Sequence, residues 1–200
     1  SANLHRSWVS VPHVTQFDEA DISELDAFRA AQKDEAQRRG LKLTFLPFVV
    51  KAVTAALREF PHFNSSLDRS GESLILKKYC HVGVAVDTEN GLLVPVIRDA
   101  DRKGLFELAA ALEDLGARAR SRRLRPADLS GGSFSISSLG GIGGTFFTPI
   151  VNHPEVAILG VSRMQWKPVW QGKDFAPRLL LPLSLSYDHR VIDGASAARF

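Results

Sequence analysis

The chain has 200 residues, of which 44% are hydrophobic and 24% charged, a composition typical of one globular domain with a sizeable core. The lone cysteine, Cys80, excludes an intrachain disulfide, and no apolar run approaches the roughly 20 residues that a membrane-spanning helix needs. The N-terminal residues lack the apolar core of a signal peptide. We therefore expect a soluble, cytoplasmic protein that does not bind a membrane.

Positive charge is concentrated in one segment. The formal net charge is +3, and arginines are frequent between positions 118 and 125. Such a cluster could bind a phosphate-rich ligand or an acidic partner, but the cationic end of a helix and the solvated loop after it are the favoured interpretation. Because no aromatic side chains are interleaved for stacking on bases, nucleic-acid binding is not expected. The arginines are Arg118, Arg120, Arg122, Arg123 and Arg125.

The first part of the chain predicts one strand and two helices. The strand covers residues 14–20. Ser23 is the expected N-cap of a helix that continues to Arg39, and Gly40 is its C-terminal stop. Thr44 is the expected cap of a second helix, which ends before Pro61.

The remainder is rich in short apolar runs, typical of strands. Asn90-Gly91 predicts a hairpin, and residues 104–118 return to helical spacing. Because the strands often follow one another directly, we expect an α/β fold in which helices pack on a mixed sheet, without strict βαβ alternation. The expected strands are 73–79, 81–87, 92–97, 133–138, 156–161, 167–170 and 179–187.

A last helix begins near residue 195 and would stop at Phe200 after about two turns. A domain rarely ends in this way. We therefore expect residues 1–200 to be one domain that is truncated at both ends.

The candidate chemistry centres on residues 184–194. His189 follows an alternating apolar run, and an imidazole has an ordinary pKa of roughly 6.5, which suits a general base. The alternative is a loop or core histidine without a catalytic role. Asp193 could orient the loop that bears His189, or cap the helix that follows, and both roles are compatible.

Ser137 and Ser138 lie where a predicted strand runs into a glycine-rich turn. A serine there could donate a hydrogen bond to a developing oxyanion. A plain turn, a phosphate-binding loop and a nucleophile elbow are the alternatives, and the pattern matches neither Walker A nor GxSxG. From composition alone the plain turn is favoured.

Other residue types give weaker indications. The six histidines are scattered and form no HxxxH or HExxH pair, so no metal site is expected. Trp8, Trp166 and Trp170 could line a pocket, although core or interface positions are favoured.

The segment YDHRVIDG at 187–194 resembles the HxxxDG signature of coenzyme A-dependent acyltransferases. More closely, the chain resembles the catalytic domain of the dihydrolipoamide acyltransferases of 2-oxo acid dehydrogenase complexes. SSLGGIGGT at 137–145 is most similar to acetyltransferases of pyruvate dehydrogenase complexes of the Gram-negative type. Further matching segments follow the family order over nearly the whole chain: PHVT (12–15), FNSSL (63–67), GLLVPVIR (91–98), SISSLG (135–140), FTPIVN (147–152) and PEVAILG (154–160).

This resemblance implies a chloramphenicol acetyltransferase-like fold and acetyl transfer between a dihydrolipoyl arm and coenzyme A. It implies homotrimers with each site between two subunits, assembled into a larger core, often of 24 subunits. Lipoyl domains and the dehydrogenase components are the implied partners, and the chain contains no lipoyl or peripheral subunit-binding domain. A succinyl or branched-chain acyl group, or a scaffold with vestigial activity, are the alternatives.

The resemblance also implies residue roles. His189 takes the proton from the thiol, and the thiolate attacks the thioester directly. Ser137 stabilises the oxyanion, and Asp193 keeps the histidine loop in place. Arg29 and Ser66 contact phosphate of coenzyme A. The chain lacks the basic segment that in the family precedes Asn3 and supplies an arginine facing the aspartate.

Overall fold

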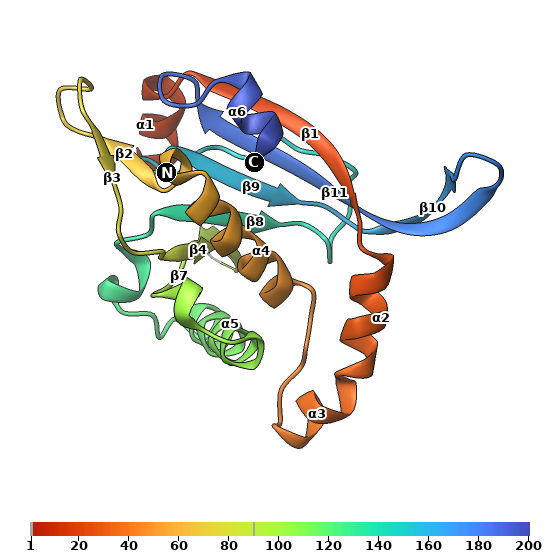
Figure 1. Cartoon of the computed structure of the whole chain (residues 1–200). Helices are drawn as coiled ribbons and strands as arrows, with labels where there is room; N and C mark the ends of the chain where they lie inside the picture. The colour runs from red at the N-terminus through yellow and green to blue at the C-terminus, as the bar shows by residue number, and fades with distance from the viewer. Residues whose placement is uncertain (1, 90) are drawn as a thin grey trace.

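The computed structural model describes residues 2–89 and 91–200, in which helices pack on a mixed sheet (Figure 1). Strands β4, β8 and β9 run parallel, whereas β1, β7, β10 and β11 pair antiparallel with their neighbours. The expected mixed sheet is therefore confirmed. Its order is β1 (His13–Asp21), β11 (Phe175–Asp188), β9 (Ala157–Val161), β8 (Phe134–Ser138), β4 (Val82–Val84) and β7 (Val96–Ile97), with β10 (Gln165–Trp170) paired to β11.

Two expected strands are each split. Residues 81–87 form β4 and then β5 (Val86–Thr88), and residues 92–97 form β6 (Gly91–Leu93) and then β7. Pro95 lies at the second break, where its missing N–H cannot continue the ladder. β5 and β6 pair as the expected hairpin, although Asn90 lies outside the described residues.

Two long helices cover one face of the sheet. α4 (Leu46–Glu59) and α5 (Leu105–Arg120) lie in front of it in Figure 1. Val50, Leu108 and Ile136 are fully buried where these helices meet the sheet. The wide apolar face of each helix thus forms the core, as its helical spacing predicts.

The expected first helix is broken. It forms α2 (Ser23–Ala31) and α3 (Lys33–Arg38), which meet at Gln32. Gly40 has a φ of +68°, so the predicted glycine stop is confirmed.

Both expected N-caps of these helices are wrong. Ile22 occupies the cap position of α2. The Ser23 hydroxyl instead donates to Asp21 and accepts from the Leu179 N–H, which ties the helix start to β11. Phe45, and not Thr44, occupies the cap position of α4.

Several smaller elements complete the fold. α1 (Ala2–Ser10) was not predicted, and α6 (Gly194–Arg199) is the expected last helix. β2 (Ser65–Leu67) and β3 (Leu74–Leu76) form a projecting hairpin. Short 3-10 turns cover η1 (Pro61–Phe63), η2 (Ala100–Arg102) and η3 (Pro126–Leu129). Within the described ranges no helix combines the length and apolarity that crossing a bilayer requires.

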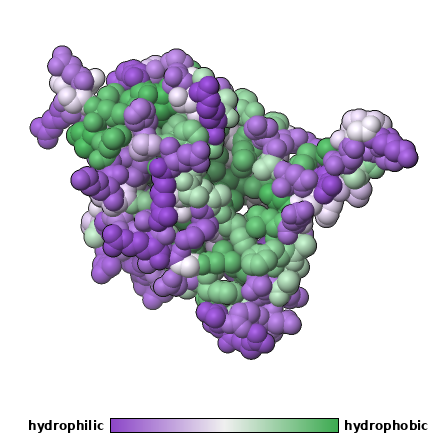
Figure 2. Space-filling model, viewed as in Figure 1, coloured by the Kyte–Doolittle hydropathy of each residue, from purple (hydrophilic) through white to green (hydrophobic). Residues whose placement is uncertain are grey.

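Apolar side chains are also exposed. Figure 2 shows a green patch beside the projecting β2–β3 hairpin, where all three residues of β3 are exposed. The predicted core position of the tryptophans is wrong, because Trp8, Trp166 and Trp170 are 63%, 62% and 55% exposed. Their role as interface anchors stays a prediction.

Candidate active site

His189 stands immediately after the end of β11. Its backbone N–H donates to the Pro12 carbonyl over 3.0 Å, and its imidazole is exposed. The buried Tyr187 ring lies 6.0 Å from the imidazole, centroid to centroid, at an interplanar angle of 30°. The imidazole is therefore presented to solvent from a rigid, buried strand end, as the sequence predicts.

The residues on either side of His189 form an ion pair. Asp188 is 2% exposed, and its carboxylate accepts from Arg190 Nε over 2.9 Å and from Nη2 over 2.6 Å. The Arg190 backbone N–H donates to the same carboxylate over 3.0 Å. His189 is thus flanked in the sequence by two residues whose side chains bind each other.

Asp193 caps α6. Its Oδ1 accepts from the Ser196 N–H over 2.7 Å, and this backbone hydrogen bond is the main reason why the Asp193 pKa lies below its usual range. The Gln16 side chain donates to the Gly194 carbonyl over 3.0 Å and ties the same helix start to β1. The predicted cap is confirmed, and it fixes the far end of the histidine loop.

Ser137 lies on the sheet face that points away from α4 and α5, because Ile136 next to it points into the helix-covered core. The register places Ser137 beside Gly160 of β9 and Gly160 beside Ser184 of β11. The Phe147 ring covers Gly160, since a Cβ at that position would lie only 2.8 Å from Phe147 Cζ. The Phe147 ring thus lies over β9 at the position that pairs with Ser137, on the sheet face to which the Ser137 side chain points.

Within one chain, Ser137 and His189 do not meet. Two strand spacings of about 4.8 Å separate Ser137 from Ser184, and the rise of about 3.3 Å per residue adds roughly 16 Å between Ser184 and His189. The two residues are therefore roughly 19 Å apart. β8 and β11 run in opposite directions, so the residues occupy opposite ends of the sheet (Figure 1).

The two residues predicted to bind phosphate are also separated. Arg29 of α2 forms an ion pair of 2.7 Å with Asp26 and stacks 4.8 Å above the Phe45 ring. It lines a pocket of about 450 Å³ together with Lys42 and Ser138, at the Ser137 end of the sheet. Ser66 is buried in β2, which lies well away from α2 in Figure 1.

A larger cavity of about 780 Å³ lies between β1, α4 and α6. None of the residues predicted for the site lines it. The smaller pocket, by contrast, is lined by Arg29, one of the residues predicted to bind phosphate, and by Ser138 next to Ser137.

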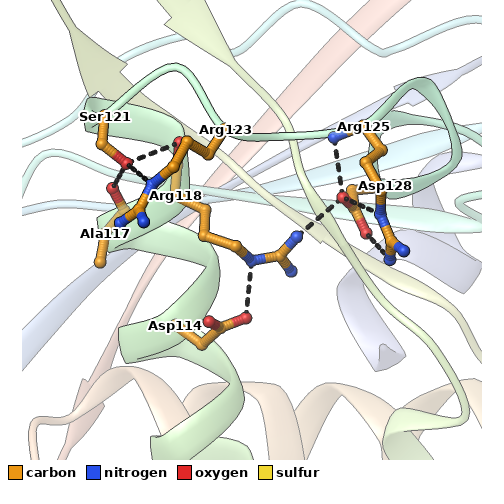
Figure 3. A network of polar contacts seen from close by, with 7 residues as sticks. All are labelled: Asp114, Ala117, Arg118, Ser121, Arg123, Arg125 and Asp128. Atoms are coloured by element: carbon orange, nitrogen blue, oxygen red, sulfur yellow. Dashed lines mark hydrogen bonds and ion pairs between the residues drawn. The ribbon is translucent and has the colours of Figure 1, made fainter.

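The arginine cluster is engaged in a local network (Figure 3). Arg118 bonds Asp114 and Asp128 over 2.8 Å each, and Arg125 also binds Asp128. The Arg125 and Arg118 guanidiniums hold the pKa of Asp128 well below its usual range. This arrangement agrees with the favoured interpretation of a helix end and the loop after it.

Sequence reasoning missed Phe147, Gly160 and Tyr187. Gly160 carried a signal, because glycine inside an apolar strand often marks a close approach by another group. Phe147 carried none, since its neighbours Gly160 and Ser184 are distant in sequence. Tyr187 lies only two residues before His189, but its burial depends on strands that pair with β11 from elsewhere in the chain.

The sequence profile of the 2-oxoacid dehydrogenases acyltransferase (catalytic domain) matches residues 1–200. The chain belongs to this family. It is 64% identical over 200 residues to the dihydrolipoyllysine-residue acetyltransferase component of the pyruvate dehydrogenase complex of Pseudomonas aeruginosa, covering 100% of this chain and 37% of the relative. The corresponding component of Azotobacter vinelandii is 63% identical, and the match covers 100% of this chain and 31% of that relative. The chain thus spans about a third of the length of these relatives.

Solved structures of the family agree with the fold. Azotobacter vinelandii dihydrolipoamide acetyltransferase superposes with a TM-score of 0.98 at 64% identity, over 99% of this chain and 82% of that one. Its structure comes from a study of the role of a serine, a histidine and an asparagine in the catalytic mechanism. The cubic core of a pyruvate dehydrogenase multienzyme complex gives 0.98 at 63% identity, with 99% and 82% covered. Chloramphenicol acetyltransferase superposes with a TM-score of 0.59 at 19% identity, over 98% of this chain and 89% of that one. This similarity shows a shared fold alone, and it confirms the expected architecture.

Proposed function

We propose that this acyltransferase domain moves an acetyl group between the dihydrolipoyl arm of a lipoyl domain and coenzyme A, as the core of a pyruvate dehydrogenase complex in the bacterial cytoplasm. The observation that carries the proposal is His189, held at the end of a buried strand with its imidazole open to solvent. Family membership over the whole chain supports it.

In this mechanism the His189 imidazole takes the proton from the attacking thiol. The thiolate adds to the thioester carbonyl, and the oxyanion accepts a hydrogen bond from the Ser137 hydroxyl. Collapse expels the second thiolate, which takes the proton back from the imidazolium. No acyl-enzyme forms, so Ser137 acts as a donor and not as a nucleophile.

The site is completed by two chains. The separation of roughly 19 Å between Ser137 and His189 leaves each chain with two half-sites. In the proposed homotrimer, His189 of one chain meets Ser137 of the next. Assembly of trimers into a core of 24 subunits is supported by the relative that is described as a cubic core.

The roles of the three residues are supported by the Azotobacter vinelandii study. The serine, histidine and asparagine that it names have the same separations along their chain as Ser137, His189 and Asp193 have here. An aspartate thus stands here where that enzyme has an asparagine. Both are good N-caps, so the contact with Ser196 is compatible with either.

Phe147 supports a small acyl group. The carbonyl that accepts from Ser137 carries its acyl substituent within a few ångströms of that hydroxyl, and the Phe147 ring covers the adjacent Gly160. A succinyl or branched-chain group is larger than acetyl, and a ring on this sheet face favours the smaller group. Acetyl therefore fits this side of the site better than either alternative.

Coenzyme A phosphates find cationic partners at the Ser137 end. Arg29 and Lys42 line the same pocket as the Gly140-Gly141 turn, and this positive charge suits a phosphate group. Ser66 lies towards the other end of the sheet, so in the proposed trimer a neighbouring chain supplies its contact with the phosphate of coenzyme A.

The test uses the full-length protein and an acetyl-coenzyme A assay. His189→Ala should lower kcat by about 10²- to 10⁴-fold and Ser137→Ala by about 10²- to 10³-fold, with sedimentation unchanged. The exposed His62 provides a control, and His62→Ala should retain the rate. A near-normal rate in His189→Ala would refute the mechanism, and a large but inactive wild-type particle would favour the scaffold alternative.

A further inference from the structure

Asp188 is a buried carboxylate that the proposed mechanism does not use. It is the last residue of β11, its backbone N–H donates to the Val156 carbonyl over 2.8 Å, and it lies opposite His13 of β1. Burying a carboxylate costs several kcal/mol unless it is paired and hydrogen-bonded. Its presence one residue before His189 therefore needs an explanation.

The carboxylate is paired with the residue that follows His189. Arg190 donates to it through Nε, Nη2 and the backbone N–H, at distances of 2.6–3.0 Å. A planar guanidinium that binds both carboxylate oxygens fixes direction as well as distance. The Asp188–Arg190 pair therefore closes a small ring of contacts around the backbone of His189.

The turn does not need this pair in order to form. The Asp188 carbonyl already accepts from the N–H groups of Val191 and Ile192 over 3.0 Å each. The Asp193 cap holds the far side of the loop. The Arg190 side chain is 44% exposed, and an ion pair between a buried carboxylate and a partly exposed arginine adds little net stability. Its effect is therefore to hold the turn in one conformation.

We propose that Asp188, through its ion pair with Arg190, is a positioning residue that fixes the His189 imidazole for proton transfer. The proposal rests on the proposed function, since it assigns His189 as the base. A base that is displaced by about 1 Å loses up to roughly 10²-fold in rate. Breaking the pair therefore lowers the rate without removing a group that touches the substrate.

The first variant is Asp188→Asn in the full-length protein. An amide keeps the shape but presents one acceptor oxygen and a donor NH2, so it cannot accept both Arg190 contacts. We expect kcat for acetyl transfer to fall by about 10- to 100-fold and KM for coenzyme A to change by less than about twofold. An unchanged kcat overturns the proposal.

A matched control lies in the network of Figure 3. Asp128 also accepts from arginine side chains, Arg125 and Arg118, and its side chain is 12% exposed, but it belongs to η3. Asp128→Asn removes a comparable pair at another part of the fold, and we expect its kcat to stay within about twofold of wild type. An equal loss of kcat in both variants would mean a general effect on the fold and would overturn the positioning role.

A double-mutant cycle tests whether Asp188 acts through His189. In the His189→Ala background, Asp188→Asn should lower the residual rate no further, because the base to be positioned is absent. Additive losses overturn the proposal. If Asp188→Asn does not fold, Arg190→Lys, which keeps the charge but loses the two-point contact, takes its place with the same expected loss of kcat and the same contradicting result.

Failure of the proposed function gives a different pattern. An inactive wild-type protein, or an active His189→Ala variant, refutes the mechanism itself. An active wild type, an inactive His189→Ala variant and an unaffected Asp188→Asn variant refute the positioning role alone.

Discussion

Replacing Glu155 by glutamine should stabilise the protein at neutral and alkaline pH. Glu155 is 5% exposed, and burial raises its pKa to about 8. Asn152 Nδ2 contacts Oε1 over 3.4 Å, whereas Oε2 has no hydrogen-bond partner among the described residues. The folded protein therefore holds this carboxyl protonated at a pH at which the unfolded chain releases the proton.

The magnitude follows from the two pKa values. Because folding raises the Glu155 pKa, the protonated carboxyl adds to the free energy of unfolding in full below pH 4.5. This contribution is lost as the pH rises towards about 8. At about 1.36 kcal/mol per pH unit, the total loss is at most about 5 kcal/mol. Because a glutamine amide is neutral at every pH in this range, the variant lacks this loss.

Urea unfolding at pH 5, 6, 7 and 8, at one protein concentration, measures the effect. The free energy of unfolding of Glu155→Gln should exceed that of wild type by an amount that grows by about 3 to 4 kcal/mol between pH 5 and 8. Glu113 is exposed on α5, so Glu113→Gln should show no such growth. Parallel curves for wild type and Glu155→Gln would refute the assignment of a protonated, buried carboxyl.

Substitutions at three further residues probe the site. Asp193→Asn should retain the α6 cap and most of kcat, whereas Asp193→Ala should lower the free energy of unfolding by about 1 kcal/mol in a denaturation assay; a large loss of kcat in Asp193→Asn would show that the charge matters. Phe147→Ala should raise the ratio of kcat/KM for isobutyryl-coenzyme A to kcat/KM for acetyl-coenzyme A by about tenfold or more. Phe146→Ala is the control, and an unchanged ratio in Phe147→Ala would exclude the ring from acyl selection. Gly160→Ala should lower stability by about 1 to 3 kcal/mol in thermal unfolding, because a methyl group there meets the Phe147 ring; an unaltered melting temperature would contradict that packing.

Much of the local structure was predictable from the chain. The alternating run that ends at Asp188 forms β11, and Asp193 caps the helix that it precedes. Both signals are local, because side-chain alternation and capping depend on residues a few positions apart. The failed Ser23 cap was not predictable, because the Ser23 hydroxyl accepts from a backbone group of the distant Leu179. The break at Gln32 has no counterpart in the residue pattern, since no glycine or proline marks it.

The sequence by itself determined the local setting of the residues that we propose for the chemistry: His189 after a strand, Asp193 before a helix, and Ser137 before a glycine turn. Only the tertiary structure decided where they stand relative to one another. β9 separates β8 from β11, and β8 and β11 run in opposite directions, so Ser137 and His189 fall at opposite ends of one sheet. Strand order and direction depend on pairing between residues far apart in the chain, which no local pattern encodes.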